Sequence, residues 1–370
     1  MADIRLKFGT SNNSPFYSEL KKRVDNYFIS NGYSRHANGH MIFKMIFIFL
    51  LLITSYTALL SNHLTESQML LCAVLFGISQ TLIAFNVAHD ASHGALFTNT
   101  KLNRFFSYSF NLIGVSNYIW NIKHNLSHHT FTNIPGHDMD IEQTKIARFT
   151  VNSKPKWFHK YQYLYLPLFY PFLSIFIIFI KDFMMFQKQK YGNSEVNHPK
   201  SEYRILIVSK LFYVIYALII PLIIIDLPWY KILLGFLIVH MVVGLFLAMI
   251  LIPVHALDDS DFPEADANGT IHNSWVIHQI ESTSNYGANS WLLTWLAGGL
   301  NTHIIHHIFP TICHIHYFEL TKIIRQTSLE YGIKFRDKHV WQAVISHLRF
   351  LKKLGRPQTS DPPSGGTSDK

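Results

Sequence analysis

Cysteine and charged residues are scarce in this chain of 370 residues. It has two cysteines, Cys72 and Cys313, and 15% of its residues are charged. Two cysteines cannot hold an iron–sulfur cluster of the usual four-thiolate kind, and Cys72 lies inside an apolar run, so neither a cluster nor a disulfide framework is expected. With 49% hydrophobic and 15% aromatic residues, the composition also departs from that of an average soluble protein.

Motifs for bound electron carriers and for nucleic acid are also missing. No Gly-x-Gly-x-x-Gly follows a predicted strand, which argues against a nicotinamide site. The one His-Pro pair, His198-Pro199, is followed by Lys200 and not by the Gly-Gly of a fused b-type cytochrome domain. The formal charge of +9 comes without a basic tract in a recognition fold, so we expect no nucleic-acid partner. The first forty residues are polar and contain no cleavable signal pattern.

What the sequence does contain is long apolar runs. A helix needs about 20 apolar residues to cross a bilayer. Runs of this length occupy residues 41–60, 69–88, 203–225 and 231–254. Short loops pair them into two hairpins. Both loops lack Lys and Arg, whereas the segments that flank the hairpins are basic, and the positive-inside rule therefore places the flanking segments in the cytoplasm. The predicted fold is an all-α integral membrane protein with four transmembrane helices in two hairpins and a cytoplasmic helical cap.

A fifth apolar stretch, residues 164–180, is ambiguous. It is apolar enough to span a bilayer, but Pro167 and Pro171 interrupt it. If it crossed, the polar segments before and after it would lie on opposite sides of the membrane and could not share one site. We therefore expect an interfacial or half-buried helix here.

The two ends of the chain divide it into three regions. Residues 1–40 form an N-terminal cytoplasmic region, 41–354 the membrane domain, and 355–370 a tail with the composition of a disordered end. Within the first region we expect disorder over residues 1–13 and then an amphipathic helix, which Ser14 caps and Pro15 begins. Its apolar positions recur every four residues: Phe16, Leu20, Val24 and Phe28. This helix lies on the membrane or on the catalytic body. Lys44, near one end of the first run, is expected to extend its amine to the interface.

Three short histidine clusters lie at the polar ends of the runs and between them. Their spacings are H-x-x-x-H, H-x-x-x-H-H and H-x-x-H-H. The eight residues are His89, His93, His124, His128, His129, His303, His306 and His307. On a helix such spacings direct at least two imidazoles toward one point. Imidazole is the commonest metal ligand in proteins, and eight ligands are too many for one ion. Paired surface histidines would explain one cluster but not three, so we expect two metals.

Other histidines near the clusters have less certain roles. His240 and His255 lie on the last run, fifteen residues or about 22 Å apart on a helix, so both cannot reach one metal cluster. His255, at the cytoplasmic end, is the candidate ninth ligand, and His240 is expected to form hydrogen bonds between helices. His278 is a ligand or a neighbour of the ligands. His314 and His316 are expected either to contact the metal ligands without binding the metal or to lie at the surface.

Several acidic and aromatic residues complete the candidate site. Asp90, Asp138 and Asp140 lie beside the clusters, where they are either ordinary loop carboxylates or partners that orient ligating imidazoles. For Asp140 we favour the orienting role. Candidate residues for an apolar substrate channel are Trp120, Trp291, Trp295 and Phe85. Lys123, near its mouth, is a candidate contact for a phosphate-bearing acyl carrier.

Four motifs resemble those of the membrane-bound fatty acid desaturases. They are KHNLSHHTFTN at 123–133, GHDMDI at 136–141, GGLN at 298–301 and HHIFPTICHIHY at 306–317. The resemblance covers about residues 15–350 and is strongest to bacterial relatives of the linoleoyl-CoA desaturases. The chain departs from that subgroup at His303, where the subgroup has Gln, and at Ile305, where it has an acidic residue. The double-bond position of the subgroup therefore does not carry over.

The resemblance implies a fold, a cofactor and a reaction. It implies a four-span enzyme, in a bacterial inner membrane, with a non-haem di-iron centre on the cytoplasmic side. The eight cluster histidines are then ligands, and His255 matches a further histidine at the end of the family's last span. The enzyme would use O2 to introduce a double bond into an acyl chain carried by CoA, acyl carrier protein or a lipid. Electrons would come from a separate ferredoxin or cytochrome.

Other functions remain open at this point. An acyl-chain hydroxylase or an acetylenase could use the same clusters, and only the product separates them. A metal transporter would place its ligands near the bilayer midplane, whereas here they cluster at span ends and in polar loops. A zinc hydrolase would need fewer ligands, an open coordination position and a carboxylate base.

Overall fold

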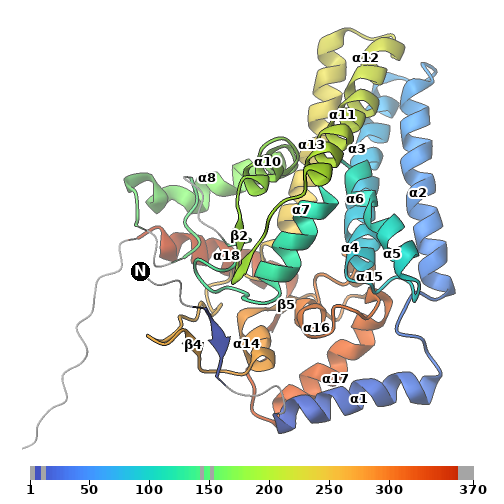
Figure 1. The fold of residues 1–370 in the computed structure, drawn as a ribbon. Coiled ribbons are helices and arrows are strands. Elements are labelled where there is room, and N and C mark those ends of the chain that lie inside the picture. The colour runs from blue at the N-terminus through green and yellow to red at the C-terminus, as the bar shows by residue number, and fades with distance from the viewer. Residues whose placement is uncertain (1–4, 10–13, 142–145, 151–153, 357–370) are drawn as a thin grey trace, which may run out of the picture.

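The chain folds into a bundle of long helices that stands on a cap of shorter ones (Figure 1). The computed structural model describes residues 5–9, 14–141, 146–150 and 154–356. Within this part, five helical stretches are long and apolar enough to cross a membrane, by length and composition. The mostly helical architecture and the membrane-protein character expected from the sequence are thus confirmed.

The first hairpin begins at the cap and returns to it. It consists of α2 (Gly39–Leu60), α3 (Glu66–Ile83), the π-helix η1 (Ala84–Ala88) and α4 (His89–Ser92). Thr65 and Gln68 form a capping box at the start of α3, which satisfies two backbone N–H groups that the helix itself leaves unpaired. The last three elements continue one another as a single stretch of 27 residues, so the second apolar run leads directly into the first histidine cluster.

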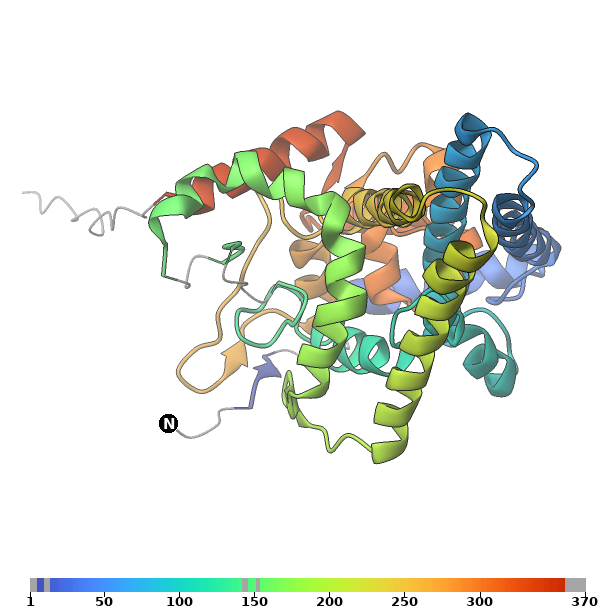
Figure 2. The ribbon, with the colours of Figure 1, turned by 90° about the horizontal axis from the view of Figure 1, so that it is seen from above.

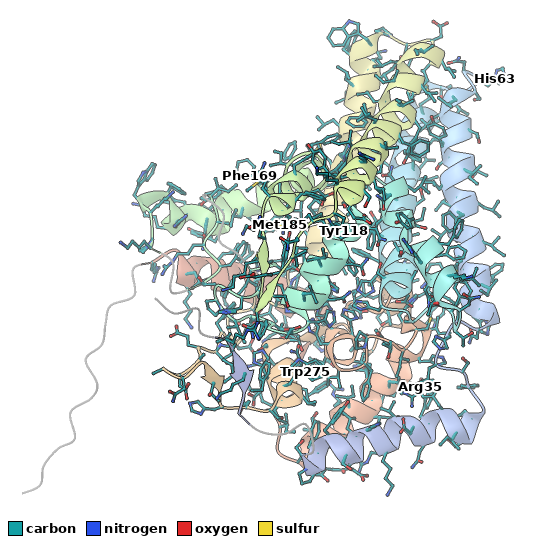
Figure 3. The ribbon with its side chains drawn as sticks, in the orientation of Figure 1. Arg35, His63, Tyr118, Phe169, Met185 and Trp275 are labelled. Carbon is teal, nitrogen blue, oxygen red and sulfur yellow. The ribbon has the colours of Figure 1, made fainter. Side chains whose placement is uncertain are left out.

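The second hairpin lies beside the first. It consists of α11 (Lys200–Val214), the π-helix η6 (Ile215–Ile219), α12 (Ile220–Ile224) and α13 (Trp229–Leu251). The turns of the two hairpins touch: the Asn62 side chain donates to the Ile224 carbonyl at 2.8 Å and accepts from the Asp226 N–H at 2.9 Å. His63 marks this end of the bundle in Figure 3, far from Arg35 in the cap.

The fifth apolar stretch is bent and lies across the bundle. Its parts are η3 (Trp157–Tyr161), α8 (Gln162–Phe169), η4 (Tyr170–Phe172), α9 (Leu173–Phe176), η5 (Ile177–Lys181) and α10 (Asp182–Phe186). Figure 2 shows it from the side, whereas α2 and α13 are seen end-on. The break at Pro171 packs against Gly244 of α13, where a Cβ would lie 2.1 Å from the Pro171 carbonyl oxygen.

The N-terminal helix lies on the cap. α1 (Pro15–Asn31) is capped by Ser14, as expected, and buries Phe16, Leu20, Val24 and Phe28. These side chains pack against Ile304, Tyr317 and Ile324, so the helix lies on the catalytic body. Disorder over residues 1–13 was wrong in part: Lys7–Phe8 form a strand, β1, parallel to Thr270–Ile271, because the extended chain finds backbone partners there. Residues 1–4 and 10–13, and most of the predicted tail (357–370), lie outside the described residues.

The remaining elements build the cap. The helices that precede the fifth apolar stretch are α5 (Thr100–Ser107), α6 (Ser109–Leu112), α7 (Asn117–Asn121) and the π-helix η2 (Ile122–His128). Those that follow α13 are α14 (Trp275–Ser282), α15 (Trp291–Leu296), α16 (His303–Ile308), η7 (His314–His316), α17 (Tyr317–Glu330) and α18 (Val340–Leu354). The further strands are β2 (Lys190–Tyr191), β3 (Ser194–Glu195), β4 (Thr270–Ile271), β5 (Asn285–Tyr286) and β6 (Asp337–Lys338). β2 pairs with β3 and β5 with β6, so these short strands pin loops and form no extended sheet.

Candidate metal centre

The first histidine cluster lies where α3 widens into a π-helix. His89 begins α4, and His93 is its C-cap. Gly298, at φ +60°, lets the chain approach this turn closely, because a Cβ there would lie 2.4 Å from the Phe85 carbonyl oxygen. The GGLN motif at 298–301 therefore packs directly against the turn that presents the first cluster.

The second cluster also lies on a π-helix, which the spacing alone did not reveal. The N–H of His129 donates to the carbonyl of His124 at 2.9 Å, a bond between residues five apart. The wider turn brings the Nε2 atoms of these two residues to 3.0 Å of each other. Two imidazoles of this cluster thus converge as expected, but they are residues five apart and not the three or four apart that an ordinary α-helix would align.

The third cluster and His255 come from the opposite side of the site. α16 carries His303, His306 and His307, and His255 follows the end of α13 by four residues. The Ile304 N–H, at the start of α16, donates to the Asn285 side chain at 3.0 Å, which holds the helix against the strand region of the cap. Four separate segments of the chain thus meet at one place.

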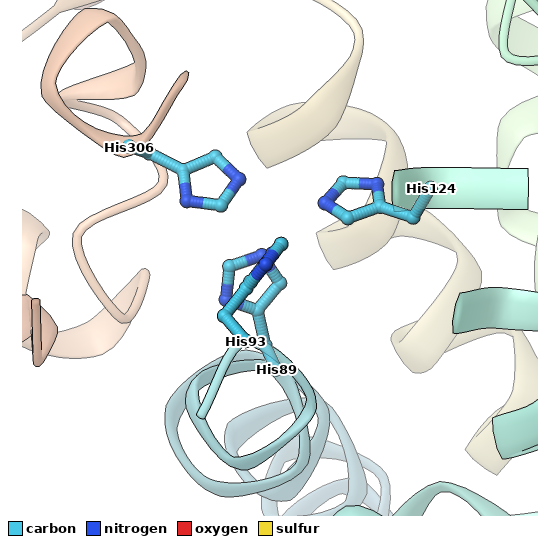
Figure 4. Close-up of side chains that lie close together, drawn as sticks. All are labelled: His89, His93, His124 and His306. Carbon is cyan, nitrogen blue, oxygen red and sulfur yellow. The ribbon is translucent and has the colours of Figure 1, made fainter. Parts of the chain in front are cut away.

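The nine candidate ligands form two groups of four with one histidine between them. Site A is His89, His93, His124 and His306 (Figure 4). Site B is His128, His255, His303 and His307. In each group one nitrogen from every residue lies within 4.8 Å of the others. His129 is close to both groups, with its Nε2 2.9 Å from that of His306 and its ring 4.3 Å from that of His307. The structure therefore brings together all nine histidines singled out in the sequence.

The chemistry of this donor set fits a pair of metal ions. Buried ring nitrogens without a protein hydrogen-bond partner include Nε2 of His89, His93 and His307. Burial lowers the pKa of His93 and His306 well below the usual value and that of His255 to about 3, so these imidazoles are neutral with a free lone pair. Buried polar atoms rarely lack a partner, and convergent neutral imidazoles are the ligands that iron, zinc and copper accept.

Hydrogen bonds orient three of the histidines of site B. His128 Nδ1 lies 3.0 Å from Asp138, His307 Nδ1 lies 2.8 Å from the Gln279 side-chain oxygen, and His303 Nδ1 lies 3.1 Å from the Leu300 carbonyl. Such contacts hold one ring nitrogen so that the other faces the metal. Burial lowers the pKa of His128, but Asp138 and Asp140 outweigh this effect, and the pKa is raised. Gln279 was not expected from the sequence; its position one residue after His278 on α14 was the available signal.

The two carboxylates of the GHDMDI motif differ in their contacts. Asp138 is buried and bonds to His128. Asp140 forms an ion pair with Lys123, and its Oδ2 lies 3.9 Å from His124 Nδ1 and 3.8 Å from His128 Nδ1. These distances exceed a hydrogen bond. Asp138 is thus the carboxylate in direct contact with a candidate ligand, whereas the role predicted for Asp140 stays a prediction.

Packing surrounds site A. The Trp120 ring stacks on His124, with ring centroids 4.2 Å apart, and meets His89 and His93 edge-on at 5.5 and 5.8 Å. Phe110 packs on the other side of Trp120, with ring centroids 4.7 Å apart. Trp120 therefore packs against both site A and the apolar cluster of the bundle, and its role in a substrate channel stays a prediction.

A buried polar chain lies behind His89. Asp90 accepts from His314 Nδ1 at 2.8 Å, and His314 Nε2 lies 3.0 Å from the amine of Lys44. Lys44 also donates to the Trp295 carbonyl and is 2% exposed. Our expectation that Lys44 reaches toward the interface was wrong, because these polar partners hold its amine inside the protein. His314 therefore belongs to this series of buried hydrogen bonds and does not lie at the surface.

The other residues singled out in the sequence lie apart from the two groups. His240 bonds to Ser174 at 3.0 Å and lies 3.3 Å from the Tyr213 hydroxyl, as expected for a histidine between helices. Trp291 is 61% exposed, so it does not line a channel. In the described part of the chain, His278 and His316 join neither group. His278 packs on Phe8, and His316 packs among Tyr27, Phe28 and Tyr33.

Comparison with known proteins agrees with this geometry. The family model named fatty acid desaturase matches residues 67–339, which is most of the chain. The chain belongs to the fatty acid desaturase family. This desaturase is 30% identical over 356 residues to the sn-1 linoleoyl-lipid 6-desaturase of Synechocystis sp., a match that covers 95% of this chain and 98% of that one.

Further relatives come from other organisms. The sn-1 linoleoyl-lipid 6-desaturase of Arthrospira platensis is 29% identical, with 96% of each chain covered. The acyl-lipid (8-3)-desaturase of Physcomitrium patens is 28% identical over 95% of this chain and 74% of its own. The resemblance stated from the motifs is confirmed, and the protein is an oxidoreductase with fatty acyl desaturase activity.

Proposed function

We propose that this desaturase uses O2 and two non-haem irons, one at site A and one at site B, to introduce a double bond into a lipid-linked acyl chain. The observation that carries the proposal is the pair of four-histidine groups with His129 between them. Two groups of converging imidazoles suit two iron ions, and a carboxylate-rich or cysteine-rich set is not needed. The proposed ligands are the nine histidines of site A, site B and position 129.

The reaction needs an oxidant stronger than any side chain. When bound, the two irons supply O2 activation and the abstraction of two hydrogens from adjacent methylenes. In the balanced reaction, two electrons from outside, two protons and the two hydrogens of the acyl chain reduce O2 to two waters and leave one C=C bond. The residues of the chain hold the centre in place: Asp138 and Gln279 orient ligands, and Trp120 keeps the site dry on its bundle side.

The acyl carrier is proposed to be a lipid. The relatives from Synechocystis, Arthrospira and Physcomitrium carry "lipid" in their names, and they match nearly the whole chain. The alternatives, acyl-CoA and acyl carrier protein, would require an anion site near the mouth of the channel. Lys123, our candidate for it, already pairs with Asp140, which weakens that alternative.

Electrons are proposed to come from a separate ferredoxin or cytochrome, because the sequence holds no motif for a carrier of its own. Purified protein loaded with iron should therefore give no product with NADH and O2 alone, and should give product once a ferredoxin or cytochrome and its reductase are added. Full turnover with NADH and O2 alone would contradict the proposal.

We propose four membrane crossings, with both metal sites on the cytoplasmic side of a bacterial inner membrane. The contact between the two hairpin turns puts them at one end of the bundle, and the break at η4 lets the fifth apolar stretch lie across it. Cysteines introduced at residues 226–230 should react with a membrane-impermeant reagent added from the periplasm. Labelling of these cysteines only from the cytoplasmic side would contradict this topology.

Fatty acid profiling of an expressing host tests the reaction itself. Gas chromatography with mass spectrometry should detect a new unsaturated acid when redox partners are supplied, and a His128→Ala strain should lack it, because His128 is a proposed ligand of site B. A hydroxylated or acetylenic product would be consistent with the proposed metal centre but would show that the reaction is not desaturation. A protein that binds no iron would overturn the proposal.

A further inference from the structure

α18 exposes a face that changes character along its length. Its first turns expose Trp341, Val344 and Ile345, with Leu348 half-buried, and its last turns expose Arg349, Lys352 and Lys353. Positions 341, 344, 345 and 348 share one side of a helix, so the apolar residues form a stripe. We call these seven residues the α18 face. Trp341 is 77% exposed, so its indole lies open to whatever surrounds the protein.

A second helical segment beside α18 repeats this pattern. The Gln162 side chain donates to the Leu351 carbonyl at 2.8 Å, and a Cβ on Gly355 would lie 2.2 Å from the His159 carbonyl oxygen. Figure 2 shows η3 and α8 alongside α18. Their exposed apolar residues recur at helical spacing: Trp157, Tyr161, Leu164 and Leu168. The two segments therefore present two neighbouring apolar stripes.

Positive charge gathers where the two segments meet. Lys154, Lys156 and Lys160 are exposed on or just before η3, and Lys352 lies over the Tyr163 ring at 5.5 Å. The sequence contains no Asp or Glu between residues 146 and 170 or between 339 and 356. Asp258 contacts α18, but it does so through Ser346 on the buried side. The exposed side thus carries several cations next to its apolar stripes.

The start of α18 lies near the end of a membrane-length helix. Val340, at the start of α18, and Leu293 of α15 both pack around Gly287. The neighbouring strand residue Tyr286 donates its hydroxyl to the carbonyl of Met249, a half-exposed residue near the end of α13. The first turn of α18 is therefore linked through Gly287 and Tyr286 to the end of α13, which is long and apolar enough to cross a membrane.

We propose that the α18 face docks on the bilayer, with Trp341 and its apolar neighbours among the upper acyl chains and Arg349, Lys352 and Lys353 against anionic lipid head groups. Tryptophan gathers at membrane interfaces, and a helix with an apolar stripe and a basic end lies in the interface plane. Basic residues beside such a helix attract anionic phospholipids. The inference rests on the proposed topology for the choice of leaflet, and it does not depend on the reaction.

An acidic protein, such as an electron donor, would also meet the cations. The lipid surface fits better, because a docking site for a soluble acidic protein does not need two apolar stripes that adjoin the lipid-facing bundle. The stripes on α8 and α18 flank the basic residues, which is the arrangement of an interfacial pair of helices.

Fluorescence quenching of Trp341 in nanodiscs tests the proposal. The full chain would be placed in phosphatidylcholine discs with or without phosphatidylglycerol, using lipids brominated in the upper acyl chain, and Trp341→Phe would isolate the Trp341 signal. We expect quenching of that signal, stronger with phosphatidylglycerol. The variant Arg349→Glu/Lys352→Glu/Lys353→Glu should lose the gain from phosphatidylglycerol, whereas Lys21→Glu/Lys22→Glu on the exposed side of α1 should keep it.

A tryptophan placed on the cap provides the matched control. Leu329 on α17 is 64% exposed, so Leu329→Trp in the Trp341→Phe background should remain unquenched. An unquenched Trp341, or quenching that is the same with and without phosphatidylglycerol, would overturn the proposal. The proposal would also be overturned if the triple variant lost binding to an acidic redox protein while the quenching of Trp341 stayed unchanged. None of these measurements needs iron or turnover, so their failure is distinct from failure of the proposed reaction.

Discussion

Sites A and B have the same number of histidines but are held in different ways. Three ligands of site B, His128, His303 and His307, bond through Nδ1 to a carboxylate, a carbonyl and an amide. In site A, both ring nitrogens of His89 and the Nδ1 of His306 are buried without such a partner. Aromatic packing on Trp120 takes the place of hydrogen bonds there.

Because of this difference, we expect the two sites to differ in metal affinity and in their distance from the acyl chain. A hydrogen bond to the distal nitrogen selects the tautomer and raises the basicity of the ligand, so site B should bind its metal more tightly. Rings of site A whose distal nitrogen has no such partner keep more rotational freedom. Site A also faces Trp120 and the apolar interior, so the acyl chain should pass on its side of the centre.

Removal of one ligand from each site gives the largest expected effect. His93→Ala should empty site A and His303→Ala should empty site B, and each should lower bound iron from about two to about one per chain and abolish the unsaturated product. Iron would be measured per chain by mass spectrometry. His63→Ala, in the exposed hairpin turn, should change neither value. Loss of both irons in both variants would show that the two groups bind iron cooperatively, and would contradict the view that sites A and B are held independently.

Asp138→Asn should give the next largest effect. It removes the charged partner of His128, and loss of such a partner typically weakens metal affinity about 10- to 100-fold. The loss should fall on site B alone and show in a competitive chelator titration of the purified protein. Asp140→Asn is the matched variant and should cost less, because Asp140 makes no hydrogen bond to a ligand. Equal losses would restore Asp140 to the role predicted from the sequence.

These two carboxylates show where sequence reasoning succeeds and where it ends. The histidine clusters and His255 could be selected from the sequence, because spacing and proximity to apolar runs depend on the chain alone. The choice between Asp138 and Asp140 could not, since a single residue separates them and only the turn after η2 decides which one meets His128. The π-helical form of η2 was hidden for the same reason. No residue pattern in the sequence distinguishes an α-helical turn from a single π-helical turn, and packing from other segments selects between them.

The buried position of Lys44 shows a second limit. A lysine near the end of an apolar run is expected to reach water, and nothing within its own helix contradicts that. The partners that hold it, the Trp295 carbonyl and His314, come from more than 250 residues further along the chain. The bend in the fifth apolar stretch was accessible, because Pro167 and Pro171 lie in the sequence itself. Local chemistry could be predicted, and long-range partners could not.

Gln279→Met should have a smaller effect than Asp138→Asn. The substitution keeps the side-chain volume but removes the closer partner of His307 Nδ1, which then has only the Thr132 hydroxyl at 3.2 Å. A buried group without its partner costs about 1–3 kcal/mol, so affinity at site B should fall by roughly tenfold. The chelator titration used for Asp138 measures it. Gln279→Glu retains an acceptor and should recover most of the affinity; failure to do so would point to the bond that Gln279 donates to the His129 carbonyl.

Trp120→Phe should give the smallest effect and should fall on the other site. Phenylalanine keeps an aromatic face against His124 but loses part of the edge contact with His89 and His93, a change of about 1 kcal/mol or roughly fivefold in the affinity of site A. The iron retained at limiting concentration and the product profile would be measured together. If packing holds site A, Trp120→Phe weakens that site, leaves site B intact, and adds to Asp138→Asn without coupling, because the two changes act on separate ligands. Coupling between them would mean that His129 transmits the orientation of one group to the other.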